Sequence, residues 1–298
     1  MWEEALVAKE VGELRWSVEQ RLEFIEFRLF WQGQVNRSDL IETFQVSVNQ
    51  ASGDLTKYSD LAPGNMVYNV RVRSYERAPD FTPRFFKPDA NRYLSSLRAV
   101  SAGLIAQADS WLSAPPAHDA TPVPVRGVDA EILRAVVEAI GRKKALEVRY
   151  QSFSRPEPMW RWMAPHALAF DGFRWHARAW CEVDECFKDF VLSRMLGTRA
   201  IRVSGVDQAT DADWSEITAL EIGPHPELSP PQRAAIALDY GMIDGRLTIY
   251  VRRAMLYYAL KRLGLDTDPS ARRPQDQQIV LLGRDAVLPQ RDLPKQGR

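Results

Sequence analysis

Residues 47–58, SVNQASGDLTKY, carry side chains suited to reading the edges of nucleic-acid bases. Four apolar side chains recur at helical spacing and are predicted to face a core: Val48, Ala51, Leu55 and Tyr58. The other side of this helix holds amides, hydroxyls and a glycine, where a solvated helix normally carries Glu–Lys pairs. Asn and Gln can pair bidentately with adenine, and Ser or Thr can bind several base edges. We therefore expect this helix to enter a major groove, with contacts from Ser47, Asn49, Gln50, Ser52, Thr56 and Lys57; Asp54 is the one carboxylate expected on this face.

A basic segment follows this helix. The total charge is balanced, with 39 Lys and Arg against 39 Asp and Glu, so no global charge indicates a nucleic-acid partner. Along the chain the balance is uneven, because residues 1–30 are acid-rich whereas residues 71–98 hold seven basic and three acidic side chains. Random variation of surface charge is one explanation. Contact with phosphates is the other, and its candidates are Arg37, Arg71, Arg73 and Tyr75.

A second group of candidate residues lies between positions 150 and 194. Arg178 and Arg194 are placed at the ends of neighbouring predicted strands, together with Ser152, Ser154 and His166. Guanidinium forks and hydroxyls of this kind make a donor-rich concavity that suits phosphate. The sequence therefore predicts a pocket for an anionic ligand.

Each member of this group has a structural alternative. The two arginines can instead pair with Asp189 or Glu182 in a salt-bridged rim. Trp175 can stack a base, but a Trp opposite the arginine face is more often part of the core. Tyr150 is expected in the core with its hydroxyl at the pocket rim, and His176 fits ligand contact and ordinary surface equally well.

Metal binding and catalysis have little support. His176, Cys181 and Cys186 lack a fourth zinc ligand, and Cys-x4-Cys is a loose spacing for this metal. The chain contains no Gly-rich phosphate loop, no Gly-x-Ser-x-Gly and no His-Glu-x-x-His. We expect no catalytic residue, no metal, no cofactor and no enzymatic activity.

Three short helices are expected to position the polar segment. Ser17 followed by Gln20 is a capping box that begins the first helix, and Gly33 ends it. Asn36 is expected to cap the second helix, which a short turn joins to the third. The third begins with another capping box, Ser47 to Gln50.

The break Pro63-Gly64-Asn65 separates these helices from MVYNVRVRSYER, which alternates enough to form a hairpin with Asn69 near its turn. Three helices followed by a basic hairpin is the order of a winged helix-turn-helix, whose third helix reads DNA. A winged helix used only for protein contacts is the alternative.

The remaining segments suggest further domains. A long helix is expected at residues 90–112, followed by a Pro-rich linker and by a helix that Asp129 caps. From residue 145 the apolar period is two, which predicts the short strands of a small barrel. One strand places Leu146, Val148, Tyr150 and Ser152 on one face. The next separates Phe173, Trp175, Ala177 and Ala179 from Arg174, His176, Arg178 and Trp180, and another aligns Phe190, Leu192 and Arg194. After residue 228 the order is helix, strand, helix, strand.

Three runs in the middle of the chain resemble a WYL domain: LEVRYQSFS, MAPHALAFDGFRWHARAW and DFVLSRM. The run that names this family, Trp-Tyr-Leu, stands here as Trp175-His176-Ala177. With the winged helix and the C-terminal extension, nearly the whole chain resembles a WYL transcriptional regulator. It is most similar to the BrxR and CapW-type repressors found beside bacterial phage-defence operons. The resemblance implies an Sm-like or SH3-like β-barrel with a polar pocket for a nucleotide or nucleic-acid ligand. It also implies a dimer interface in the C-terminal block, formed by Met255, Leu256, Tyr258, Leu260 and Leu263, unless these residues form that domain's own core.

We therefore predict an α+β chain with four parts: a winged helix-turn-helix with its linking helix (1–112), a linker (113–128), a WYL domain (129–223) and a C-terminal dimerisation domain (224–298). The expected function is a homodimeric repressor that binds double-stranded operator DNA and responds to a nucleotide-like ligand. A WYL activator, a single-strand-binding protein that uses the barrel, and an enzyme acting on nucleotides are the alternatives. Two cysteines, an acidic start without a signal peptide and no apolar run of about 20 residues predict a cytoplasmic protein without a membrane partner.

Overall fold

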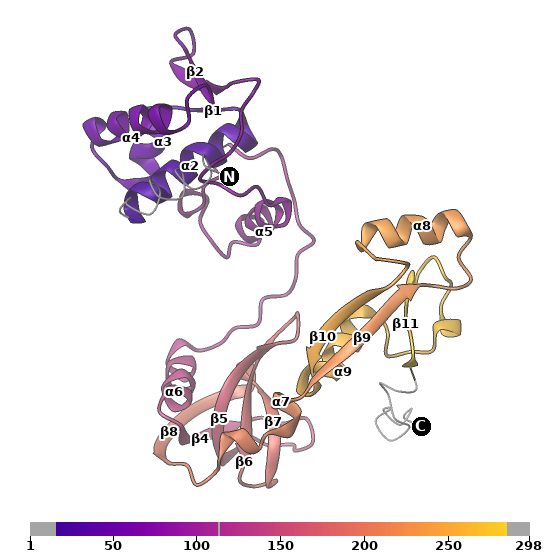
Figure 1. Cartoon of the computed structure of the whole chain (residues 1–298). Helices are drawn as coiled ribbons and strands as arrows, with labels where there is room; N and C mark the ends of the chain where they lie inside the picture. Colours follow the sequence, from indigo (N-terminus) through magenta and orange to yellow (C-terminus); the bar gives the residue numbers. More distant parts are fainter. Residues whose placement is uncertain (1–15, 113, 285–298) are drawn as a thin grey trace. The chain divides into compact units, whose positions relative to one another are not determined.

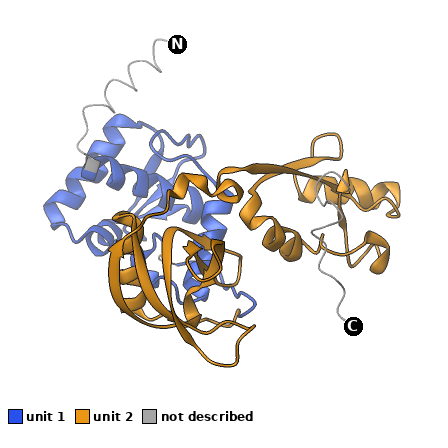
Figure 2. Ribbon diagram, turned by 90° about the horizontal axis from the view of Figure 1, so that it is seen from below, with its two compact units in different colours: residues 1–122 blue, residues 123–298 orange. Residues whose placement is uncertain are grey.

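The computed structural model describes residues 16–112 and 114–284, and the chain forms two compact units (Figure 2). The first unit comprises residues 1–122 and the second comprises residues 123–298. The acidic side chains up to Glu13 lie outside the described residues. No helix among those described is long and apolar enough to cross a membrane.

The first unit contains a winged helix (Figure 1). Its elements are α2 (Trp16–Gln32), β1 (Gln34–Val35), α3 (Arg37–Phe44), α4 (Val48–Leu61), β2 (Met66–Asn69) and β3 (Ser74–Arg77). The three strands form an antiparallel sheet in the order β1-β3-β2, so β3 pairs with both neighbours. The core takes its apolar side chains from all three helices and the first strand: Leu22, Ile25, Leu29, Val35, Leu40, Ala51, Leu55 and Tyr58. The predicted winged helix is confirmed.

Local side-chain chemistry sets the helix ends. Asn36 forms a complete capping box with Asp39 at the start of α3, and Gln45 ends that helix in the left-handed region. Ser47 caps α4 through the backbone N–H of Gln50. The reciprocal half of this predicted box is absent, because the Gln50 amide donates to Asp54 instead. Ser17 lies inside α2 and does not cap it.

The helix expected at residues 90–112 is shorter than predicted. Helix α5 (Ala90–Ser101) ends before Gly103, whose φ of 64° is left-handed, and a 3-10 turn (Gln107–Asp109) follows. Asp89 caps α5 through two backbone N–H groups. The apolar residues beyond α5 had suggested a longer helix, but one of them, Leu112, is buried against Phe27, Phe86 and Leu97.

The second unit begins with α6 (Ala130–Gly141), capped by Asp129 as expected. A five-stranded antiparallel sheet of order β7-β6-β5-β4-β8 coils around the core that α6 closes. Its strands are β4 (Lys144–Tyr150), β5 (Met159–Phe170), β6 (Trp175–Cys181), β7 (Cys186–Val191) and β8 (Met195–Val203). The strand expected to carry Leu192 and Arg194 stops at Val191, and both residues lie in a 3-10 turn.

A second, smaller sheet lies at the C-terminal end of this unit, with β9 (Ile217–Pro224) between β10 (Leu247–Arg252) and β11 (Ile279–Leu281). Helix α7 (Ala212–Ser215) precedes β9, whereas α8 (Pro230–Asp239) and α9 (Leu256–Leu263) pack on the core of this sheet. Leu260 is buried in that core, and Leu256 and Leu263 pack against it. These residues therefore serve the domain's own core, which was the alternative to the dimer stripe.

Candidate DNA interface and sensor site

The exposed face of α4 is polar and uncharged over most of its length. Asn49, Gln50, Thr56 and Lys57 are exposed, and Ser52 is half-buried. Asp54, expected on this face, is instead 2% exposed and paired with Arg21 of α2 at 2.6 Å. No carboxylate therefore interrupts this face between its first turn and Lys57. Val48 was expected in the core but is 53% exposed.

Neighbouring groups hold part of this face in place. The Arg37 guanidinium of α3 donates to the Ser52 hydroxyl at 3.3 Å, which places a positive charge beside the polar helix. The Thr56 hydroxyl donates to the Ser52 carbonyl within α4. Among the described residues, the side chains of Asn49 and Lys57 make no hydrogen bond. They are the groups of α4 most available to an outside partner.

The hairpin β2–β3 with its turn at residues 70–73 forms the wing. Arg71 and Arg73 are exposed in that turn, and Arg73 adopts a left-handed φ of 52°. Tyr75 is half-buried and packs against Tyr68 with ring centroids 5.0 Å apart, so it is partly committed to the fold. Two further basic residues have backbone partners: Arg77 donates to the Phe30 carbonyl, and Arg84 donates to the Leu61 carbonyl.

The residues predicted to form one pocket in the barrel fall into two groups. The first contains Arg178, whose Nε and Nη2 donate to the two oxygens of Asp211 at 2.7 and 2.9 Å. Nη1 donates to Asp189 at 3.3 Å, and the side chain is 6% exposed. His166 joins the same carboxylate at 2.9 Å. Arg178 is thus saturated by acids inside the unit, as the salt-bridge alternative anticipated, although Asp211 was not predicted as a partner.

His176 belongs to the same face of β6 as Arg178 and is 1% exposed, which excludes the surface alternative. Its Nε2 lies 2.9 Å from the Asp171 carboxylate, and its ring packs on Tyr258 of α9 at 5.0 Å between centroids. The Tyr258 hydroxyl donates to Asp189 at 3.1 Å. This face of the barrel therefore contacts the C-terminal domain.

Hydrogen bonding sets the charges of this network. Burial alone would raise the pKa of Asp211, but hydrogen bonds from Arg178 and His166 outweigh it and hold that pKa below its ordinary value. Asp171 behaves in the same way, since burial is outweighed by bonds from His176 and from the backbone at residues 173 and 174, and its pKa is lowered. Burial and the nearby Asp189 charge raise the pKa of Tyr258. Both aspartates are ionised at neutral pH, and the tyrosine stays protonated as a donor.

The second group lies at the loop after β4. The hydroxyls of Ser152 and Ser154 are 3.2 Å apart, and the Arg194 guanidinium lies 3.9 Å from the ring centroid of Phe153. Phe153 is 90% exposed and was not predicted as a site residue. Its position between the two serines was the available signal. This group therefore combines a flat, exposed ring and two hydroxyls of the loop with the Arg194 cation of the 3-10 turn after β7.

Tyr150 and Trp175 belong to neither group. Tyr150 is buried as expected, and its hydroxyl accepts the Val191 N–H at 3.2 Å. Trp175, a candidate for stacking a base with the core as the alternative, is 49% exposed and packs on Phe170, so it does not lie in the core. Cys181 lies in the barrel core, on the opposite face of β6 from His176, so these two groups do not converge on a metal.

Sequence reasoning also missed a buried arginine in the barrel. Arg161 is 6% exposed, lies over the rings of Tyr150 and Phe190, and pairs with Asp184 at 3.5 Å. Alternation along β5 was the available signal, because it places Arg161 on the same face as buried Met163.

The comparisons with known proteins follow the same division of the chain. Residues 17–99 match the BrxR transcriptional regulator winged helix-turn-helix domain, and residues 131–200 match the WYL domain. Residues 217–287 match the BrxR transcriptional regulator C-terminal dimerization domain. The DNA-binding transcriptional repressor CapW of Stenotrophomonas maltophilia is 38% identical over 277 residues, which cover 93% of each chain. This chain belongs to the BrxR/CapW family of WYL-domain regulators.

A second CapW repressor, from Pseudomonas aeruginosa, is 37% identical over 273 residues, which cover 92% of this chain and 91% of the relative. Both CapW relatives are named as DNA-binding transcriptional repressors, in agreement with the expectation that this chain is not an enzyme. Among solved structures, the proteasome accessory factor B/C (PafBC) of Arthrobacter aurescens matches 91% of this chain and 46% of its own. It does so at 16% identity and a TM-score of 0.26, which supports no inference about function.

Proposed function

We propose that this chain is a homodimeric transcriptional repressor that binds double-stranded operator DNA through α4 and the wing. The observation that carries the proposal is the burial of Asp54, which leaves the exposed face of α4 polar and free of carboxylates as far as Lys57. A carboxylate on this face would be repelled by the phosphates beside a major groove. The relatives named as DNA-binding repressors support the same assignment.

The two parts of the interface have different tasks. Asn49 is the leading base contact, because its amide is exposed and matches the donor and acceptor of adenine. Gln50 and Ser52 contribute after giving up their present partners. Arg37, Arg71, Arg73 and Lys57 contact phosphates, which fixes the register of the protein on the duplex without reading sequence.

The C-terminal domain supplies the dimer contact. Since the stripe on α9 packs within the domain, the interface needs other apolar groups. Among the described residues of this domain, the most exposed large aliphatic side chains are Leu238 at the end of α8, 82% exposed, and Ile243 in the turn after it, 79% exposed. Exposed aliphatic side chains of this size mark interaction surfaces when they cluster. We place the dimer contact at this end of α8.

The loop at residues 151–155 together with Arg194 is the proposed sensor. The exposed Phe153 ring can stack a base, and Arg194 with the two serines can hold a phosphate. A nucleotide or short nucleic acid is the fitting ligand class, and the regulated genes are proposed to be a phage-defence operon. The barrel is joined to the C-terminal domain instead, through Arg178, Asp211 and Tyr258.

Electrophoretic mobility shifts with the protein's own upstream DNA test the proposal. For a repressor we expect binding to this duplex that a matched, unrelated duplex does not compete away. The same binding should block transcription in vitro. Enhanced transcription on the same DNA would indicate the activator instead. Tighter binding to single strands than to any duplex would favour the barrel as the main nucleic-acid surface.

A further inference from the structure

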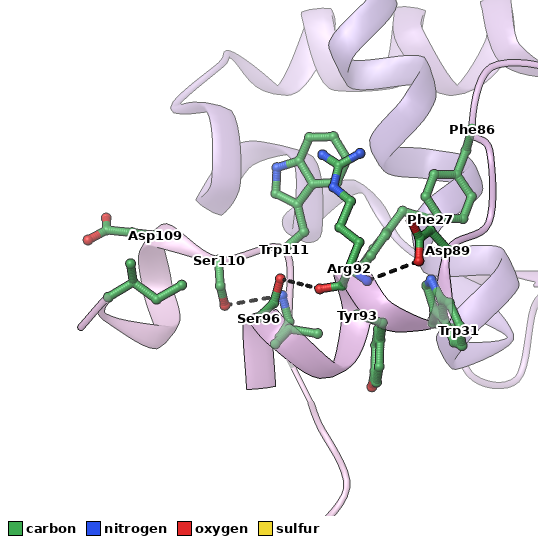
Figure 3. Close-up of a pocket in the computed structure, with 12 residues that line it drawn as sticks. Phe27, Trp31, Phe86, Asp89, Arg92, Tyr93, Ser96, Asp109, Ser110 and Trp111 are labelled. Carbon is green, nitrogen blue, oxygen red and sulfur yellow. Dashed lines mark hydrogen bonds between the residues drawn. The ribbon is translucent and has the colours of Figure 1, made fainter. Parts of the chain in front are cut away.

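A cavity of about 190 Å³ lies beside α5 in the first unit, among the side chains that Figure 3 shows. Two of its charged groups are engaged by the protein, because Asp89 caps α5 through two backbone N–H groups and Arg92 lies 3.5 Å from Glu23. Its rings pack on one another, with Trp31 stacked on Tyr93 at 4.4 Å between centroids. These contacts serve the packing of α5 on α2 and point to no class of ligand.

The barrel holds another feature that the proposed function does not use, a pair of cysteines. The chain has two cysteines, and both are free thiols. They lie on the neighbouring antiparallel strands β6 and β7 (Figure 1), where Cys181 stands directly opposite Cys186 in the register. Residues 182–185 form the turn between the two strands.

The spacing of these positions matches that of a disulfide. Directly opposed residues of an antiparallel pair have Cα atoms about 4.5–5.5 Å apart and side chains on the same face of the sheet. Disulfides join residues whose Cα atoms are about 4.4–6.8 Å apart. A bond between the two sulfurs therefore requires rotation of the side chains and no change in the pairing of the strands.

The groups beside Cys181 suit it to complete such a bond. Its buried thiol donates to the Asp184 carboxylate, with Sγ 3.0 Å from Oδ2. Lys188 lies 2.9 Å from the same carboxylate, and hydrogen bonds from Cys181 and Lys188 hold the pKa of Asp184 below its ordinary value. Nη1 of Arg161 donates to the Cys181 sulfur at 3.9 Å. An acceptor for the thiol proton and a cation for the developing thiolate are therefore both in place.

The two thiols differ in their access to solvent. Cys186 is half-buried, whereas Cys181 is 0% exposed, and burial raises the pKa of the Cys181 thiol. A small oxidant therefore reaches Cys186 first, and Cys181 reacts with the product of that step.

We propose that Cys181 and Cys186 form a reversible disulfide when the chain meets a peroxide. The Cys186 thiolate attacks one oxygen of hydrogen peroxide, the O–O bond breaks, and a sulfenic acid and hydroxide result. The Cys181 sulfur then attacks the Cys186 sulfur. Its proton passes to Asp184 and from there to the departing hydroxide, which leaves as water. In total both thiols are oxidised, the peroxide is reduced to water, and each thiol proton ends in a water molecule.

This disulfide lies beside the contact between the barrel and the C-terminal domain. Strand β7 also carries Asp189, which accepts hydrogen bonds from Arg178 and Tyr258. A bond across the hairpin would fix the pairing of β6 with β7 next to this contact.

Peptide mass spectrometry tests the bond directly, because trypsin cleavage after Arg178 and Lys188 leaves both cysteines in one peptide, residues 179–188. The full-length chain is treated with hydrogen peroxide, unfolded, alkylated with iodoacetamide and digested. We expect a peptide without alkyl groups that is lighter than the dithiol by two hydrogen atoms, and that dithiothreitol makes alkylatable. Alkylation of both thiols after peroxide, a Cys186 sulfinic acid as the main product, or a bond between two chains would overturn the proposal.

Substitutions separate the roles of the groups around the pair. Cys181→Ser should stop the reaction at the Cys186 sulfenic acid, which dimedone traps, whereas Cys186→Ser should leave Cys181 a thiol. Asp184→Asn should slow formation of the disulfide at least about tenfold. Glu185→Gln, at an exposed position of the same turn, is the matched control and should not change the rate. Equal rates in the Asp184 and Glu185 variants would overturn the assignment of Asp184 as the proton acceptor.

Equilibration in glutathione buffers measures whether the fold favours the bond. In the folded chain we expect the ratio of disulfide to dithiol to be about tenfold higher than in the same chain unfolded in urea. This difference corresponds to a reduction potential about 30 mV lower in the folded chain. An equal or lower ratio in the folded chain would show that the strands hold the sulfurs apart, and would overturn the proposal.

Discussion

Asp54 and Arg21 form a buried ion pair in which Nε and Nη2 of the arginine donate to the two carboxylate oxygens at 2.6 and 3.2 Å. The pair joins α2 to α4 and positions the DNA-facing helix. It also removes the one acidic side chain expected on the exposed face.

Removing one partner of this pair should destabilise the winged helix strongly. Asp54→Ala leaves Arg21 buried without its carboxylate, which typically costs about 3–5 kcal/mol. Urea unfolding monitored by circular dichroism measures the loss. Asp60→Ala, at an exposed position of the same helix, is the control and should change the free energy of unfolding by less than about 0.5 kcal/mol. Similar stability of the two variants would contradict the structural role of the pair.

Loss of a base contact and loss of a phosphate contact should differ in how DNA affinity depends on salt. Asn49→Ala should weaken binding to the cognate duplex by roughly 1–3 kcal/mol and relax its specificity. Arg71→Ala should weaken binding to all duplexes and reduce the slope of log affinity against log salt by about 1. Fluorescence anisotropy at several salt concentrations distinguishes the two, with Arg134→Ala on α6 as the control. An Asn49 variant with unchanged cognate affinity would show that α4 does not read bases.

Substitution of Arg178 and of Arg194, which the sequence places in one pocket, should have different effects. Arg178→Ala leaves the Asp211 carboxylate buried with His166 and the Trp214 N–H but without its cation, so we expect a loss of about 3–5 kcal/mol in the stability of the second unit. Arg194→Ala removes a surface group stacked on Phe153 and should leave stability unchanged while abolishing the ligand response. Thermal unfolding and promoter release by added nucleotides measure the two effects. Normal release in the Arg194 variant would move the sensor elsewhere.

The aspartates of this network should make stability depend on acid pH. The pKa of Asp211 and that of Asp171 are lowered in the folded chain, so each contributes stability that is fully present above its ordinary value near 3.8. This contribution is lost as the pH falls below that value towards the folded pKa. Asp211→Asn should therefore flatten the decrease in melting temperature between pH 5 and pH 3. A slope as steep as that of the unmodified chain would assign acid sensitivity to other groups.

Dimerisation should depend on the exposed end of α8. Leu238→Glu combined with Ile243→Glu should shift sedimentation towards the monomer without changing the circular dichroism spectrum. Tyr257→Glu on α9, where the side chain is 50% exposed, is the control and should remain dimeric. If the double variant stays a dimer at the lowest measurable concentration, the contact lies on another face.

The sequence predicted the winged helix well because its signals are local. The Asn36 cap, the Ser47 cap and the glycine at the end of α2 each act within a few residues. Asp54 was placed on the wrong face although its spacing from Ala51 and Tyr58 puts it on the buried side of α4. Its charge argued against burial, and the partner that allows burial, Arg21, lies 33 residues earlier in the chain. Val48 fits the apolar period yet remains exposed at the first turn of α4.

The pocket expected in the barrel could be predicted from the sequence only in part. Alternation along β6 correctly grouped His176 with Arg178, but the acids that saturate that face arrive from outside the strand, Asp211 from the segment before β9. A turn after Val191 carries Arg194 away from the expected strand. Strand β9 was not predicted, because its central role in the C-terminal sheet depends on pairing with two later strands.

Selection of binding sites from a randomised duplex pool, repeated with Asn49→Ala, measures whether α4 reads bases in a two-fold symmetric site. We expect a two-fold symmetric site with half-sites separated by whole turns of DNA, about 10 base pairs or a multiple. The Asn49 variant should lose preference at one position in each half-site while keeping the spacing. Two results would contradict the assignment of α4 as the reading helix. Either no duplex site is enriched, or the unmodified chain and the Asn49 variant enrich sites that are identical at every position.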